Sequence, residues 1–76
     1  MSALQEKERI AKVMFVLRTI SGKTQTRLSK ILKVSFQQIQ KYEKALNGIG
    51  SDKLFVLAKE QGWDINLLYN GDPEQM

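Results

Sequence analysis

The sequence predicts an all-α fold, a compact bundle of five short helices around one core. Two observations lead to this prediction. Apolar residues recur at helical spacing in five successive stretches, and residues suited to helix ends separate these stretches. In addition, a chain of 76 residues has room for one small core and no second one. We therefore expect one domain over residues 1–71, followed by a C-terminal tail over residues 72–76.

The first helix is predicted from about Ala3 to Ile20. An apolar stripe follows one of its faces and consists of Ile10, Val13, Met14, Leu17 and Ile20. Ser2 and Gln5 are placed to cap its start, and Gly22 suits the left-handed residue that follows a helix end. Phe15 points away from the stripe, so we expect it to be exposed or to pack on something else.

The next two helices are predicted within residues 24–44. Thr24 and Ser35 stand where N-caps belong, because a hydroxyl there accepts a hydrogen bond from a free backbone N–H. Ser35 and Gln38 also fit a capping box. Apolar residues at helical spacing follow each cap: Leu28, Ile31 and Leu32, then Phe36, Ile39 and Tyr42. Two short helices joined by a tight turn have the geometry of a helix-turn-helix.

A loop with two glycines separates this pair from the fourth helix, which is predicted over residues 52–61. We expect Ser51 to cap the fourth helix and Gly62 to end it. The inner face of this helix is predicted to consist of Leu54, Leu57 and Ala58.

A short fifth helix is predicted to begin after Asp64 and to end at Asn70 and Gly71. Pro73 prevents continuation of this helix, because it lacks a backbone N–H. We expect the remaining tail to be frayed.

The positive charge is concentrated on the predicted helix-turn-helix. Residues 23–44 carry six basic side chains and one acidic side chain, a net charge of +5. The rest of the chain carries six basic and seven acidic side chains, a net charge of −1. A basic face on a helix pair is typical of nucleic-acid binders. A solvated lysine face on an ordinary helical bundle is the alternative on charge alone.

The composition argues against several classes of function. The chain has no cysteine and no histidine, which removes disulfides, thiolate metal sites, the usual general base and the commonest metal ligand. No apolar run approaches the length of a membrane span, and the start of the chain lacks a signal-peptide pattern. We therefore expect no metal, no cofactor, no enzymatic activity, no membrane association and a cytoplasmic location.

The order and spacing of many residues resemble one family. The matching residues are Leu17, Arg18, Gly22, Thr24, Gln25, Leu28, Ser29, Val34, Ser35, Ile39, Glu43, Leu54, Leu57, Ala58, Gly62, Leu67 and Leu68. The chain, from about Ile10 to Gly71, is similar to regulators of the phage repressor and Cro type, also called the xenobiotic-response-element family. This resemblance implies a lambda-repressor-like DNA-binding domain that regulates transcription as a repressor. Its implied partners are double-stranded DNA with a palindromic operator and, at least on DNA, a second copy of the chain.

Two departures from the family pattern concern turns. Lys33 occupies a position where the family usually has glycine, and a left-handed lysine should cost about 1 kcal/mol. Ala45 replaces another frequent glycine, which allows the third helix to run to Leu46 and leaves the turn to Asn47 or Gly48.

The resemblance places the recognition helix, over about residues 35–45, in the major groove. Base contacts are expected from Phe36, Gln37 and Lys41, with Gln38 ranked lower because of its capping role. Phosphate contacts are expected from Thr24, Gln25, Arg27, Lys44, Asn47, Gly48 and Ser51. The alternative is an ordinary exposed helix start, in which Phe36 is a hydrophobic staple or contacts a partner.

Further roles are implied by the same resemblance. Arg18 and Glu43 are expected to form a buried ion pair with a structural role. Phe55, Ile65 and Tyr69 are the candidate dimer interface, with completion of the core as the alternative. One alternative function is a protein-interaction module of the antitoxin or antirepressor type, which binds a partner through Phe15 or the C-terminal apolar residues. RNA binding is a further alternative, although the sequence lacks the exposed aromatic platforms on which readers of single strands stack bases.

Overall fold

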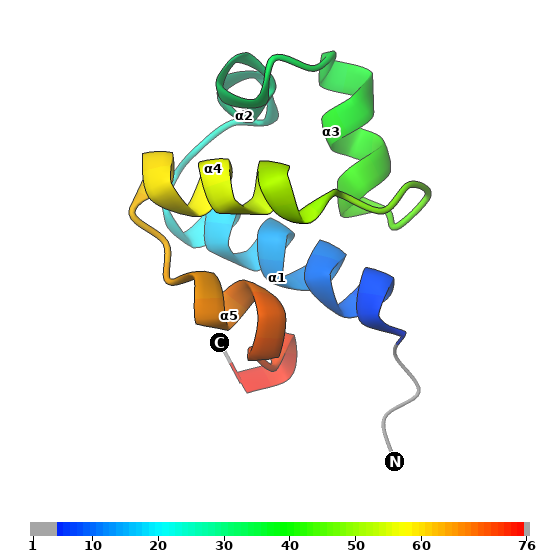
Figure 1. The fold of residues 1–76 in the computed structure, drawn as a ribbon, viewed down its shortest axis with the longest axis vertical. Helices are drawn as coiled ribbons and strands as arrows, with labels where there is room; N and C mark the ends of the chain where they lie inside the picture. Colours follow the sequence, from blue (N-terminus) through cyan, green and yellow to red (C-terminus); the bar gives the residue numbers. More distant parts are fainter. Residues whose placement is uncertain (1–4, 76) are drawn as a thin grey trace.

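The computed structural model describes residues 5–75. It contains α1 (Glu6–Ile20), α2 (Gln25–Leu32), α3 (Phe36–Glu43), α4 (Ser51–Gln61), α5 (Ile65–Asn70) and a short 3₁₀ turn, η1 (Pro73–Gln75). Figure 1 shows α2 and α3 at one end of the molecule, α1 and α4 across its middle, and α5 at the other end. The predicted five-helix, all-α bundle is confirmed. Within the described range, no helix is both long enough and apolar enough to cross a membrane.

All five helices contribute apolar side chains to one core. The buried apolar residues are Ala11, Val13, Met14, Leu17, Leu28, Leu32, Ile39, Tyr42, Leu54, Leu57, Ala58 and Leu68. The predicted stripe of the first helix is wrong at its last position, because Ile20 is 70% exposed. Ile20 is the final residue of α1, where the chain turns away, and Ala11 joins the core from the same helix.

Side-chain N-caps begin three of the helices, as predicted. The Thr24 hydroxyl accepts from the backbone N–H of Arg27 at 3.1 Å, and the Ser35 hydroxyl accepts from that of Gln38 at 3.0 Å. The Asp64 carboxylate likewise accepts a backbone N–H at the start of α5. The local sequence alone therefore fixes the starts of α2, α3 and α5.

Two predicted helix starts differ from the structure. Ser51 is the first residue of α4, and Gly50 takes the N-cap position without a side-chain hydrogen bond. For α1, the proposed cap Ser2 and the proposed start Ala3 lie outside the described residues. Among the described residues, this helix begins one residue after Gln5, whose backbone N–H donates to the Glu8 carboxylate at 3.1 Å.

Helices α1 to α4 end in the same way, with a left-handed residue after the last turn. These residues are Gly22, Lys33, Ala45 and Gly62, with φ between 58° and 71°. After each of them, the next backbone N–H donates to the carbonyl five residues earlier, at 2.9 to 3.1 Å. This hydrogen bond satisfies a carbonyl that the helix itself leaves free. The predicted left-handed conformation of Lys33 is confirmed.

The predicted extension of the third helix to Leu46 is wrong. Helix α3 ends at Glu43, and Ala45 makes the turn two residues earlier than residue 47. The Leu46 N–H then donates to the Lys41 carbonyl at 2.9 Å. The closing hydrogen bonds thus outweigh the helical preference of alanine.

The segment after α5 is more ordered than predicted. Instead of a frayed tail, it forms η1, which packs against α1. Arg9 of α1 binds the C-terminal end of α5, because its guanidinium donates to the backbone carbonyls of Tyr69 and Gly71. A cation at a helix C-terminus also interacts favourably with the helix dipole.

We predict that replacing either Lys33 or Ala45 by glycine raises the free energy of unfolding by up to about 1 kcal/mol, since glycine adopts a left-handed conformation without strain. Chemical denaturation measures this change. The control is Lys30→Gly within α2, which should lower the free energy of unfolding by about 1 kcal/mol. A loss of stability in Lys33→Gly and Ala45→Gly would contradict the left-handed conformations.

Candidate nucleic-acid interface

The start of α3 presents an exposed face to solvent. Ile39 and Tyr42 are buried in the core and fix the opposite face of this helix. Phe36, Gln37 and Lys41 are exposed. Gln37 and Lys41 are four residues apart, so they lie one helical turn from each other on the same side. The helix therefore carries an aromatic, an amide and an ammonium group on one accessible surface.

The two other glutamines of α3 are less accessible. Gln38 and Gln40 are both half-buried. The Ser35 side chain caps the helix through the Gln38 N–H, but the reciprocal hydrogen bond of a capping box is not found among the described residues. By helix geometry, Gln40 lies between Phe36 and Lys44 on the exposed face, whereas Gln38 lies on the other flank. Helix geometry thus places Gln40 closer to the exposed face than Gln38.

The N-terminal end of α2 is accessible for an anion. Thr24, Thr26 and Arg27 are exposed, and the first backbone N–H groups of a helix have no partner within the helix. The side chain of Gln25 points toward α3 and not toward this accessible end, because its amide nitrogen donates to Oε1 of Glu43 at 2.8 Å. Gln25 can therefore offer its backbone N–H to an anion while its side chain contacts α3.

The Arg18–Glu43 ion pair connects α1 to the last residue of α3. Nε of Arg18 lies 2.6 Å from Oε2 of Glu43, and Nη2 lies 3.0 Å from Oε1. The remaining nitrogen, Nη1, donates to the carbonyl oxygen of Lys23 at 3.0 Å. The side chains of Arg18 and Glu43 are only 14% and 4% exposed. Together with Gln25, the pair joins α1, the start of α2 and the end of α3.

The loop between α3 and α4 lies beside the first half of α1. Asn47, Gly48 and Ser51 are exposed, as a phosphate contact requires. A Cβ atom added to Gly48 would lie 3.7 Å from the side chain of Lys7. A Cβ atom on Gly50 would meet the Asp52 carboxylate at 2.7 Å. Among the candidate phosphate contacts of this loop, Gly48 therefore has the basic side chain of Lys7 next to it, whereas the acidic Asp52 lies next to Gly50. Arg27 and Lys44 are exposed basic residues outside this loop.

The three candidate dimer residues differ in accessibility. Phe55 is 61% exposed and Tyr69 is also exposed, so both are free to contact another molecule. Ile65 is half-buried and packs against the core. Trp63 packs there too, and its indole N–H donates to the Ser21 hydroxyl at 3.2 Å. Of the three candidates, Phe55 and Tyr69 are therefore accessible to another molecule, whereas Ile65 packs against the core.

We predict that Arg18→Met lowers the free energy of unfolding by about 3–5 kcal/mol, because Glu43 would keep a buried charge without its partner. The double variant Arg18→Met/Glu43→Leu should lose clearly less, since no unpaired charge remains. Urea denaturation of the single and double variants measures both effects. Glu43→Leu is the second single variant of this cycle. If its loss and that of Arg18→Met simply added up in the double variant, the two charges would not be coupled.

Comparisons with known proteins place this geometry in context. The chain is 34% identical over 62 residues to an uncharacterized HTH-type transcriptional regulator of Rickettsia conorii, a match that covers 82% of this chain and 50% of that protein. A protein of Rickettsia prowazekii with the same description is 32% identical over 62 residues, which cover 82% of this chain and 48% of that protein. An uncharacterized HTH-type transcriptional regulator of Sinorhizobium medicae is 49% identical over 37 residues, or 49% of this chain and 27% of that protein.

The chain spans about half the length of the two rickettsial relatives. No family model matches it. No solved structure matches it either. The relatives all carry the name of helix-turn-helix transcriptional regulators, and the helical fold with its α2–α3 pair is consistent with that name.

Proposed function

We propose that this chain is a DNA-binding domain of the phage repressor and Cro type, which regulates transcription with α3 in the major groove of double-stranded DNA. The observation that carries this proposal is the exposed start of α3, whose opposite face is anchored in the core. The net charge of +5 on residues 23–44 supports it, because a duplex is a polyanion. The names of the relatives support DNA binding at a general level.

Each exposed group of α3 matches a feature of a base edge. The Gln37 amide can form two hydrogen bonds with an adenine, and the Lys41 ammonium can donate to the acceptors of a guanine. The Phe36 ring can cover the methyl group of a thymine. These three residues would therefore read sequence, with Gln38 in a lesser role.

Contacts with the phosphate backbone would hold α3 in the groove. The N-terminus of α2 offers backbone N–H groups and the positive end of the helix dipole, with Thr24 and Gln25 at this end. Arg27 and Lys44 would contribute positive charge, and the loop over residues 47–51 would contact the backbone on the far side. None of these contacts carries sequence information by itself.

Assembly would double the recognised sequence. A homodimer through Phe55 and Tyr69 would address two half-sites of a palindromic operator in the cytoplasm, where it would act as a repressor. A protein-interaction module of the same fold is the second candidate, since Phe15 and Phe55 are exposed aromatic side chains. Binding of duplex DNA distinguishes the two candidates.

We predict that in vitro selection from a random duplex library yields near-palindromic sites with half-site centres about 34–36 Å apart. Such sites would reflect two copies of α3 on one face of the duplex. Recovery of a single asymmetric short site would contradict the dimer. Failure to enrich any duplex at low salt would contradict DNA binding and favour the interaction module.

We predict that Gln37→Ala weakens binding to the selected duplex by about 1–3 kcal/mol and relaxes the preference at one base pair per half-site. Binding to a scrambled duplex should stay nearly unchanged, because the charge of the protein is the same. Titrations of both duplexes measure the difference. The control is Gln75→Ala, which removes an exposed glutamine from η1. Equal weakening of binding to both duplexes would contradict the base contact and indicate that Gln37 contacts phosphate.

We further predict that Arg27→Ala and Lys44→Ala weaken binding to all duplexes alike. Each should reduce the slope of log K against log salt concentration by about one for each phosphate that the side chain neutralises in the parent complex. Titrations at several salt concentrations give this slope. The control is Lys59→Ala on α4, which removes an exposed lysine outside residues 23–44. An unchanged slope in Arg27→Ala or Lys44→Ala would show that the residue is merely solvated.

A further inference from the structure

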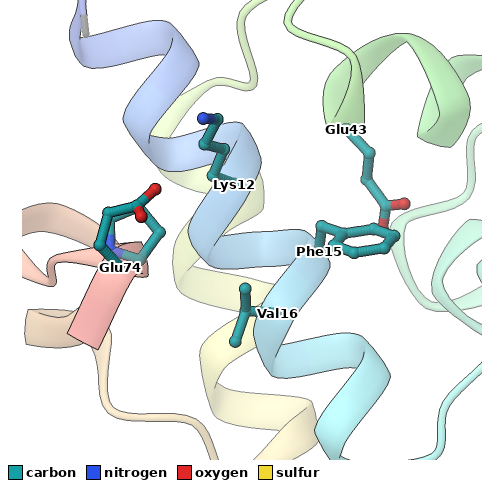
Figure 2. Close-up of a pocket in the computed structure, with 6 residues that line it drawn as sticks. Lys12, Phe15, Val16, Glu43 and Glu74 are labelled. Atoms are coloured by element: carbon teal, nitrogen blue, oxygen red, sulfur yellow. The ribbon is translucent and has the colours of Figure 1, made fainter. Parts of the chain in front are cut away.

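Phe15 has an unusual position for a large apolar residue. Its side chain is 49% exposed and lies on the face of α1 that does not enter the core. It borders a surface groove of about 290 Å³, together with Lys12, Val16, Glu43, Pro73 and Glu74. Figure 2 shows the side chains that line this groove, with Phe15 on α1 and Glu43 at the end of α3 directed toward the same side. Core packing therefore does not account for the position of this ring.

The ring also contacts the partner of that carboxylate. The guanidinium carbon of Arg18 lies 5.5 Å from the centroid of the Phe15 ring, within the range of a cation–π interaction. The same guanidinium donates two hydrogen bonds to Glu43. Arg18 is thus held by an aromatic ring and a carboxylate together. Glu43 and Phe15 also line the same groove, so the ring and the ion pair lie close together at this surface.

We propose that Phe15 is a positioning residue for the recognition helix. Its ring covers the Arg18–Glu43 ion pair on the groove side, and this cover keeps both hydrogen bonds of the pair in place. Water competes less for charges in a poorly solvated site, so the pair holds the end of α3 more firmly. Because Gln25 donates to the same carboxylate, the cover also fixes α3 relative to the start of α2.

Nuclear magnetic resonance of the free protein tests the effect on the ion pair. The Arg18 Nε–H group donates to Glu43 at 2.6 Å, so its exchange with water reports directly on this hydrogen bond. In Phe15→Ala, this exchange should become about three- to tenfold faster, the size of a typical cation–π contribution. Phe15→Tyr keeps the ring and should restore slow exchange.

The matched control is Val16→Ala, which removes an apolar side chain from the same groove without touching Arg18 in the described contacts. Its Arg18 Nε–H exchange should equal that of the parent chain. Unchanged exchange in a folded Phe15→Ala variant would overturn the proposal. Equal acceleration in Val16→Ala would overturn it too, because the effect would then belong to the groove as a whole.

The consequence for DNA rests on the proposed function and needs a second measurement. In Phe15→Ala, the preference for the selected duplex over a scrambled duplex should fall about three- to tenfold, while scrambled-duplex binding stays constant because the charge of the protein is unchanged. An unchanged preference would overturn the positioning role. If the parent chain bound no duplex, the proposed function would fail, whereas the exchange rates would still decide whether Phe15 protects the ion pair.

Discussion

The position of α3, the proposed recognition helix, depends on one buried carboxylate. Glu43 receives hydrogen bonds from Arg18 of α1 and from Gln25 of α2, and it is itself the last residue of α3. Three helices therefore meet at this side chain. A helix pair with a short connection can still vary in its crossing angle, and apolar contacts alone tolerate such variation. Charge-assisted hydrogen bonds have preferred directions and tolerate less variation in the crossing angle than apolar contacts do. The bonds to this carboxylate therefore favour one orientation of α3.

The same contact explains why α1 belongs to the functional unit although it is remote from the exposed face of α3. The Arg18 guanidinium uses a third nitrogen for the carbonyl oxygen of Lys23, in the segment that leads into α2. The arginine thereby satisfies a backbone group as well as the charge of its partner. A buried ion pair stabilises a fold little by comparison with apolar packing, but removal of one partner strongly lowers the free energy of unfolding. The pair therefore disfavours arrangements of the three helices in which either charge stays buried without its partner.

Local sequence predicts most of the helices but few of the side-chain contacts between residues that are distant in the chain. The caps Thr24, Ser35 and Asp64 are found where hydroxyl and carboxylate residues precede apolar helical patterns. These signals lie within a few residues of the helix start, so one sequence is enough to detect them. The exposure of Phe36, Gln37 and Lys41 likewise follows from the buried positions of the same helix. Their contacts with DNA remain predictions.

The errors arise where distant or competing interactions decide. Alanine favours helix, so the turn at Ala45 is decided by the backbone hydrogen bonds that close the helix. The Arg9 guanidinium donates a hydrogen bond to the carbonyl oxygen of Gly71, a residue 62 positions away. No local sequence pattern predicts such a contact. The side-chain contact of Gln25 with Glu43, 18 positions away, is likewise not indicated by the local sequence, whereas the expected phosphate contact of Gln25 stays a prediction. Resemblance identifies a residue's position in a motif, whereas the partners of a side chain depend on the surrounding chain.

The left-handed residues Lys33 and Ala45 lie before and after α3, and they have a consequence for how the proposed base-reading face could change. Altering the bases that a protein reads requires substitutions on the exposed face of its recognition helix, and most substitutions reduce stability. Proteins tolerate such changes only while their folding remains above a threshold. Lys33 and Ala45 hold a conformation that glycine adopts more readily, and neither residue belongs to the face proposed to read bases. A glycine at either position would therefore offset part of the stability that substitutions on this face remove.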